Sequence, residues 1–368
     1  KALGKQVVAF SHFPMAEFYD GASDNIAMLL GEDAMQLARR PAEATTRALA
    51  ATGLRLHVAG HMHFNDMAMR RYGDGSGLFN IQAPSLAAYV PAYTLMTLDG
   101  SPHIEIETVR VGQVPRFDEF FPLYRAEHAH GAPWDIAMLD ATDYHDFTRR
   151  YIVELTRLRL LDDWPCDMRA LARSSLNGAD LLVLSRLHTT VTVSALSRTI
   201  GHGGLPEAMF ACLHSDGSQN GDDRHTGPRY AADLAAATES ARALAHAEGL
   251  QLEDFASWRA LDLTTDFIRL ANAGDLAFAD IPVARAAHYA LLARALEHDD
   301  AKLQRDARQA GDAPPDEWLR ARYQPLLAIM RMLANGAPSE HVQLDLESGT
   351  VTDLSGKSPL FPVSEDHR

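Results

Sequence analysis

The chain has 368 residues, 46% of them hydrophobic, which is enough to bury the cores of two domains of ordinary size. Its 34 basic and 49 acidic residues give a formal charge of −15, which argues against a nucleic-acid-binding surface and against nonspecific binding to anionic lipid. The chain contains no run of about eighteen apolar residues, so no transmembrane segment is predicted in it. Cytoplasmic and cell-envelope locations both stay open.

Two short apolar runs in the first seventy residues each end in a histidine. Because they are rich in Val, Ala and Leu, they predict buried strands at residues 6–10 and 54–59. Residues 15–31, between them, are expected to form a loop. Pro41–Thr52 predicts a helix, since proline is allowed at a first helical position and Gly53 closes the far end.

Residues 67–111 predict two β-hairpins. Two pairs of strand-like runs flank turns rich in Gly and Asp, which is a strong hairpin signal: residues 67–72 with 78–83 around Gly73–Gly77, and residues 93–98 with 104–111 around Asp99-Gly100. Ile104 and Ile106 alternate with Glu105 and Glu107, as expected for a half-buried strand.

The rest of the chain predicts mainly helices. Apolar residues recur three or four apart in five segments, which are 144–161, 230–248, 255–271, 282–297 and 314–334, the last with Pro325 inside it. Residues 181–200 fit a strand or a helix, and residues 342–346 and 350–354 predict a small hairpin. We therefore expect an α/β domain at 1–112, a linker at 113–133, a helical accessory domain at 134–340, and a hairpin with a loose tail at 341–368. For the two cysteines, Cys166 and Cys212, we expect free thiols rather than a disulfide.

Three histidines follow the first two predicted strands. His12 comes after the first, and the second ends in Gly60-His61-Met62-His63. In extended chain His61 and His63 would point the same way, with Met62 opposite. Converging imidazoles are typical ligands of Zn, Fe or Mn, so His12, His61 and His63 are predicted to bind metal.

These motifs resemble the C-terminal half of the calcineurin-like metallophosphoesterases. Ser11-His12-Phe13-Pro14 resembles the family's fourth motif, Gly60-His61-Met62-His63 resembles its fifth, and the strand meander that follows fits as well. The resemblance covers about residues 5–112. It implies half of an α/β sandwich, two mixed sheets flanked by helices, that hydrolyses phosphoesters with hydroxide activated at two Mn, Fe or Zn ions. In it, His12 and His61 would ligate one ion and His63 the other.

The family's first three motifs, Asp-x-His, Gly-Asp and Gly-Asn-His, do not precede His12. We therefore expect the chain to be part of a longer protein that carries the general-acid histidine and the remaining ligands upstream, and this part alone to be inactive. Asn65 and Asp66 could hydrogen-bond a ligand histidine from behind. Turn capping is the competing interpretation for these two residues, and core packing is favoured for His57.

Other interpretations stay open. The chain could be a binding or assembly module without catalysis that retains a remnant metal site. A metallo-β-lactamase fits less well, because its His-x-His-x-Asp-His motif would place the aspartate one residue before Asp66. An amidohydrolase barrel also fits less well, because a strand meander follows the histidines here instead of alternating strands and helices. The helical domain could cover the site, select a phosphoester substrate or form a homodimer.

Overall fold

The computed structural model describes residues 5–189, 226–297 and 313–361, and the protein is mixed α/β. It divides into two compact units that interleave along the chain. The first comprises Lys1–Arg159, Asp266–Ile281 and Met330–Arg368, and the second comprises Leu160–Thr265 and Pro282–Ile329. Whether the predicted ranges 1–112, 113–133, 134–340 and 341–368 fold as independent domains stays a prediction.

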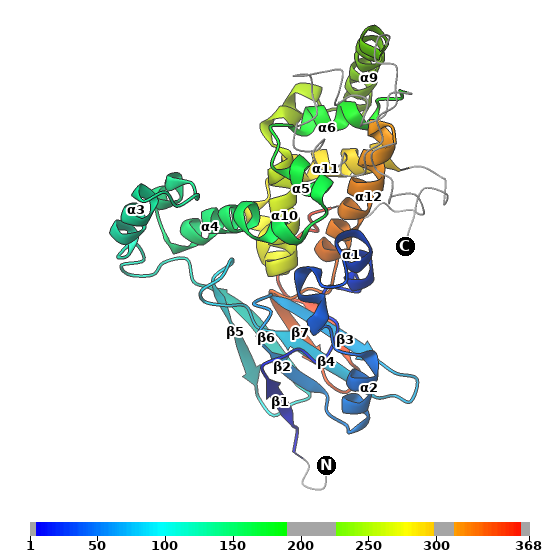
Figure 1. Ribbon diagram of the computed structural model, residues 1–368. Helices are drawn as coiled ribbons and strands as arrows, with labels where there is room; N and C mark the ends of the chain where they lie inside the picture. Colours follow the sequence, from blue (N-terminus) through cyan, green and yellow to red (C-terminus); the bar gives the residue numbers. More distant parts are fainter. Residues whose placement is uncertain (1–4, 190–225, 298–312, 362–368) are drawn as a thin grey trace. The chain divides into compact units, whose positions relative to one another are not determined.

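The first sheet of unit 1 has the strand order β1-β2-β4-β3 (Figure 1). The strands are β1 (Val8–Ser11), β2 (Leu56–Ala59), β3 (Asp66–Arg71) and β4 (Gly77–Gln82). β1 pairs with β2 and β2 with β4 in parallel, whereas β3 and β4 form the predicted antiparallel hairpin. The carboxyl ends of β1, β2 and β4 therefore share one edge of the sheet.

The second sheet of unit 1 is antiparallel, with the order β5-β6-β7-β8. Its strands are β5 (Ala92–Leu98), β6 (His103–Arg110), β7 (His341–Asp345) and β8 (Thr350–Asp353). Both predicted hairpins are confirmed. The C-terminal hairpin does not stand alone, because β7 pairs with β6 from Glu107–His341 to His103–Asp345.

An apolar core joins the two sheets. Leu56, Phe79 and Ile81 from the first sheet pack in one buried cluster with Ile106 and Leu344 from the second. The two sheets therefore face each other as layers of a sandwich. Helix α2 (Glu43–Ala51) contacts β4, and Thr46 from it donates a hydrogen bond to the Met15 carbonyl at 2.6 Å.

Two helices of unit 1 lie where loop or linker was predicted, and a third helical element lies in residues 32–40, for which no structure was predicted. Residues 15–31 contain α1 (Ser23–Leu30), the next segment contains η1 (Ala34–Arg39), and residues 113–133 contain α3 (Phe121–Ala129). The prediction missed α1 because its buried residues, Ile26, Leu29 and Leu30, are too few to give a clear period. The remaining elements of this unit are η2 (Ile136–Asp140), α4 (Tyr144–Leu158) and η6 (Gly274–Asp280).

Of the described helical elements of unit 2 and those shared by both units, the four longest occupy segments predicted as helices, and the four shorter ones lie wholly or partly outside those segments. In chain order, these elements are η3 (Leu160–Asp163), α5 (Cys166–Ala172), α6 (Gly178–Ser185), α9 (Thr226–Ala247), η5 (Leu252–Ser257), α10 (Ala260–Ala273), α11 (Val283–Leu296) and α12 (Pro315–Ala334). The ambiguous segment 181–200 is helical as far as Ser185, and residues 190–200 lie outside the described part.

Buried tryptophans anchor unit 2. Trp258 Nε1 donates to His288 Nδ1 at 3.1 Å, and Trp318 Nε1 donates to Asp167 Oδ2 at 2.9 Å, so each buried indole N–H has a partner. The expectation of free thiols is wrong for Cys166, which is disulfide-bonded, because sequence spacing does not reveal proximity. Cys212 lies outside the described residues. Among the described helices, none is long and apolar enough to cross a membrane.

Candidate functional site

Two loops bring two of the three predicted ligands, His12 and His61, together at the carboxyl edge of the first sheet. His12 follows β1 and His61 follows β2, and these strands are parallel neighbours paired from Val8–Leu56 to Ser11–Ala59. The Gly60 N–H donates to the His12 carbonyl at 3.3 Å, which ties the two loops together directly beyond the last strand pair. The strand register therefore determines that the two histidines meet.

The imidazoles of His12 and His61 are in contact. His61 Nδ1 lies 2.9 Å from His12 Nε2, and the ring centroids are 4.8 Å apart at an interplanar angle of 75°. Zinc bonds to imidazole nitrogen are about 2.0–2.1 Å long, so two nitrogens on one tetrahedral ion lie roughly 3.3 Å apart. The observed spacing is close to that value, and without metal a single shared proton fills the gap.

The other polar atom of the His61 ring has no partner. His61 Nε2 is buried and accepts or donates no hydrogen bond in the structure. Burial, followed by the charges of His12, Arg39 and His63, lowers the pKa of His61. The ring is therefore a neutral imidazole near pH 7, the form that binds metal. These residues fit a transition-metal ligand pair.

An aromatic and a cationic side chain flank the pair, and the sequence analysis missed both. The Phe13 ring lies 4.4 Å from the His61 ring, and the Arg39 guanidinium lies 5.3 Å from the centre of Phe13. Arg39 ends η1, which residue patterning did not reveal. A cation beside this pair suits an anionic ligand.

His63 does not join the His12–His61 contact. His61 and His63 have positive φ values of 63° and 59°, so this segment is a turn rather than extended chain. The premise of extended chain, from which His61 and His63 were expected to point the same way, is therefore wrong. Met62 between them is buried. His63 is exposed. Within the described residues, no group of three or more His, Cys, Asp or Glu side chains is placed to hold a metal ion.

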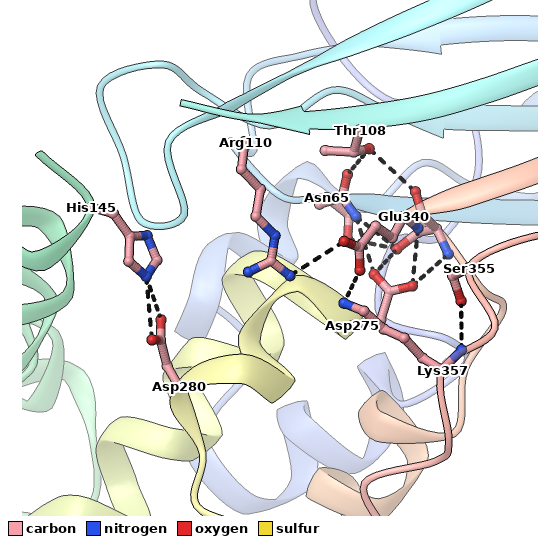
Figure 2. Close-up of polar contacts among 10 residues, drawn as sticks. Asn65, Thr108, Arg110, His145, Asp275, Asp280, Glu340, Ser355 and Lys357 are labelled. Atoms are coloured by element: carbon pink, nitrogen blue, oxygen red, sulfur yellow. Dashed lines mark hydrogen bonds and ion pairs between the residues drawn. The ribbon is translucent and has the colours of Figure 1, made fainter. Parts of the chain in front are cut away.

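Asn65 is a buried hydrogen-bonding centre (Figure 2). Its Nδ2 donates to Ser339 Oγ at 2.8 Å and to Asp275 Oδ1 at 3.4 Å, and its Oδ1 accepts from Thr108 Oγ1 at 2.8 Å. These bonds tie the end of the histidine loop to β6, to η6 and to the segment before β7. They give Asn65 a structural role, and its predicted contact with a ligand histidine stays a prediction.

Asp66 begins β3 inside a group of half-buried acids. Burial and the neighbouring carboxylates of Asp20 and Glu17 raise the pKa of Asp66 well above its usual range. Its Oδ2 is buried and has no hydrogen-bond partner. Glu17 accepts from the Tyr19 and Gly21 N–H groups and from Arg70. The structure therefore joins Asp66 to other carboxylates, and its predicted contact with a ligand histidine stays a prediction.

The acidic group predicts a pH-dependent stability. Burial, followed by the charges of Glu17 and Asp275, raises the pKa of Asp20 from 3.8 to about 7. The hydrogen bond from the Ala337 N–H and the charge of Arg70 act in the opposite direction and lower this pKa. The folded state therefore holds more protons than the unfolded state between these values, so stability falls as pH rises from about 4 to about 7. Asp20→Asn is expected to remove the part of this fall that Asp20 causes, leaving that of Asp66, and to stabilise the protein at pH 8 by up to roughly 4 kcal/mol.

Urea denaturation of both proteins at pH 4, 6 and 8 measures the effect. Asn tolerates the positive φ of residue 20, which is 51°, so the substitution changes charge with little backbone strain. Asp74→Asn, in an exposed turn, is the control and should leave the fall with pH in place. An unchanged pH profile in Asp20→Asn would contradict the prediction.

A second hydrogen-bonded chain crosses the first sheet beneath the histidine loops. Ser11 Oγ lies 2.8 Å from His57 Nε2, and His57 Nδ1 lies 2.8 Å from Asn80 Oδ1. The sequence analysis favoured core packing for His57, and this residue is indeed buried. Ser11 and Asn80 were missed as its partners, because their alignment depends on the register of three strands.

Comparison with known proteins gives no family assignment. No protein-family model matches this chain, and no curated protein matches it significantly.

Proposed function

We propose that this chain is the C-terminal part of a metal-dependent phosphoester hydrolase of the calcineurin-like type. The observation that carries the proposal is the His12–His61 pair. Two imidazoles converge at the carboxyl edge of parallel strands, with His61 Nδ1 and His12 Nε2 2.9 Å apart and a buried ring nitrogen of His61 left without a partner. This arrangement suits metal binding and has no evident use in core packing.

Each histidine has an expected role. His12 and His61 would ligate one ion, and the exposed His63 would ligate a second. Bound Mn, Fe or Zn ions would lower the pKa of water so that hydroxide can attack phosphorus. Because a ligating nitrogen must present its lone pair, the proton between the two facing nitrogens would move to a ring nitrogen that faces away from the ion when metal binds. Arg39 would help to attract the anionic substrate.

The sandwich also supports further strands beside β1 and β5. These strands end their sheets, and no other strand pairs with their outer edges within the described residues. Phe10 pairs with Val58 and Leu98 pairs with Ile104, so both side chains lie on the faces of the sheets that form the core. Even so, Phe10 is 68% exposed and Leu98 is 49% exposed. An open apolar groove of about 530 Å³, lined in part by Phe10, Val58 and Met96, separates the sheets there.

A completed sandwich would cover these apolar side chains, since parallel strands are normally covered on both faces. A strand added in parallel to β1 would end beside His12, where carboxylates could complete the coordination shell. The proposal assigns the missing ligands and the general-acid histidine to such an added segment.

The second candidate is a binding or assembly module without catalysis. It is favoured by the absence, among the described residues, of a group of three metal-ligating side chains. An open groove with two free strand edges would then be its binding surface.

One experiment separates the two functions. We would express the complete reading frame that contains the codon for Lys1, and measure hydrolysis of nitrophenyl phosphate mono- and diesters with Mn²⁺, Zn²⁺ or EDTA. The hydrolase proposal predicts metal-dependent turnover and two bound ions per chain by elemental analysis. A purified, folded product that binds no metal and hydrolyses neither ester would overturn it and favour the assembly module.

A further inference from the structure

The Ser11–His57–Asn80 chain has the connectivity of an activated nucleophile. The pairing of β1 with β2 places Ser11 two residues beyond the partner of His57, on the same face of the sheet, and β4 places Asn80 directly opposite His57. Both contacts are 2.8 Å long. A hydroxyl within reach of an imidazole that a third group orients is the recurring arrangement of serine and cysteine nucleophiles.

The hydrogen bonds identify the tautomer of His57. Asn80 Oδ1 accepts from the Met15 N–H at 2.8 Å, so this atom is the amide oxygen and cannot donate to the ring. His57 Nδ1 must therefore carry the proton that binds Asn80. In the neutral ring Nε2 then has only a lone pair, so the Ser11 hydroxyl proton has two acceptors 2.8 Å from Oγ, His57 Nε2 and the Phe13 carbonyl.

The same contacts also accommodate a His57 ring protonated from solvent beside an intact Ser11 hydroxyl. Ser11 Oγ also lies 2.8 Å from the Phe13 carbonyl. If His57 is protonated, Nδ1–H donates to Asn80, Nε2–H donates to Ser11 Oγ, and a Ser11 hydroxyl donates to Phe13. Burial lowers the pKa of His57, so the resting ring is neutral and free to accept a proton.

We propose that Ser11 is a reactive nucleophile, with His57 as its general base and Asn80 as the residue that positions His57. This activity goes beyond the proposed metal-dependent hydrolysis and does not depend on it. The serine would react with an activated tetrahedral phosphorus ester. Ser11 Oγ attacks phosphorus, a P–O bond forms and the bond to the leaving group breaks, while His57 Nε2 takes the hydroxyl proton and passes it to the leaving group. Ser11 is exposed, so such an ester can reach it.

A fluorophosphonate probe tests the proposal on the full chain in EDTA, which removes any metal-dependent hydrolysis of the probe. The reaction forms a Ser11 phosphonate ester and releases fluoride. Mass spectrometry of the Gln6–Arg39 peptide follows its rate, and Ser257 is an internal control. Ser257 is also exposed and its hydroxyl also donates to a main-chain carbonyl, that of Asp254 at 2.6 Å. General-base assistance predicts labelling of Ser11 at least about 100-fold faster than that of Ser257.

Two variants refine the result. Ser11→Ala should remove the label from this peptide, although the peptide retains the buried Ser23, which donates to Glu17. His57→Ala should reduce the rate at Ser11 to that of Ser257. Equal rates at Ser11 and Ser257 in the unsubstituted protein would overturn the proposal without any variant. A fast rate at Ser11 that persists in His57→Ala would overturn the role of His57.

Discussion

His61→Ala in the complete gene product is expected to abolish metal-dependent phosphoester turnover while leaving the protein folded. His61 would be one of two imidazoles on the same ion, and its unpartnered Nε2 shows that no hydrogen-bond network of the fold depends on that atom. Loss of an outer partner of a metal ligand typically costs about 10- to 100-fold. Loss of the ligand itself should cost more than about 100-fold and reduce the bound metal measured by elemental analysis.

His246→Ala is the matched control for this substitution. His246 is exposed in the last turn of α9 and belongs to a helix where alanine is well tolerated. Turnover, metal content and the circular dichroism spectrum should be unchanged in the control, and only the spectrum should be unchanged in His61→Ala. A His61→Ala protein with undiminished turnover would contradict the role of His61 as a ligand.

Local patterns were sufficient to predict the strands and hairpins of unit 1. Alternation and turn residues are properties of short segments, so the pairs β3–β4, β5–β6 and β7–β8 could be predicted. The pairing of β6 with β7 joins residues more than 230 positions apart, and nothing local encodes it. The predicted boundary near residue 341 therefore separates the β7–β8 hairpin from the strands β5 and β6, with which it forms the second sheet.

The site shows the same division between local and distant information. The sequence predicted that His12 and His61 each follow a strand, and the parallel pairing of these strands explains their contact. It did not predict the left-handed turns at His61 and His63, because positive φ is uncommon for residues other than glycine. Nor did it predict the partners of Asn65, because Asp275 and Ser339 come from distant segments that pack against the loop.

Asp266→Ala is expected to destabilise the protein by about 3–5 kcal/mol, because it leaves a buried guanidinium without its carboxylate. Arg269 Nη1 donates to Asp266 Oδ1 at 2.9 Å within α10, and the two side chains are 7% and 0% exposed. The remaining contacts of Arg269 are a 3.3 Å hydrogen bond to the Arg149 carbonyl and a position 5.7 Å from the centre of the Tyr89 ring. Neither of these supplies a negative charge. Burial acts to raise the pKa of the nearby Asp280 carboxylate, whereas side-chain hydrogen bonds and the charge of Arg269 lower it below its usual value, but this carboxylate makes no ion pair with Arg269.

Urea denaturation followed by circular dichroism measures the cost, and Glu239→Ala is the matched control. Glu239 and Arg242 form an ion pair with the same three-residue spacing in α9, but their side chains are 74% and 46% exposed. Loss of this pair should cost only about 0.3–0.5 kcal/mol, because water already solvates both charges. The double variant Asp266→Leu/Arg269→Met removes both buried charges and should be more stable than Asp266→Ala. If Asp266→Ala cost no more than Glu239→Ala, water would have to reach Arg269 in the folded protein, contrary to its burial in the structure.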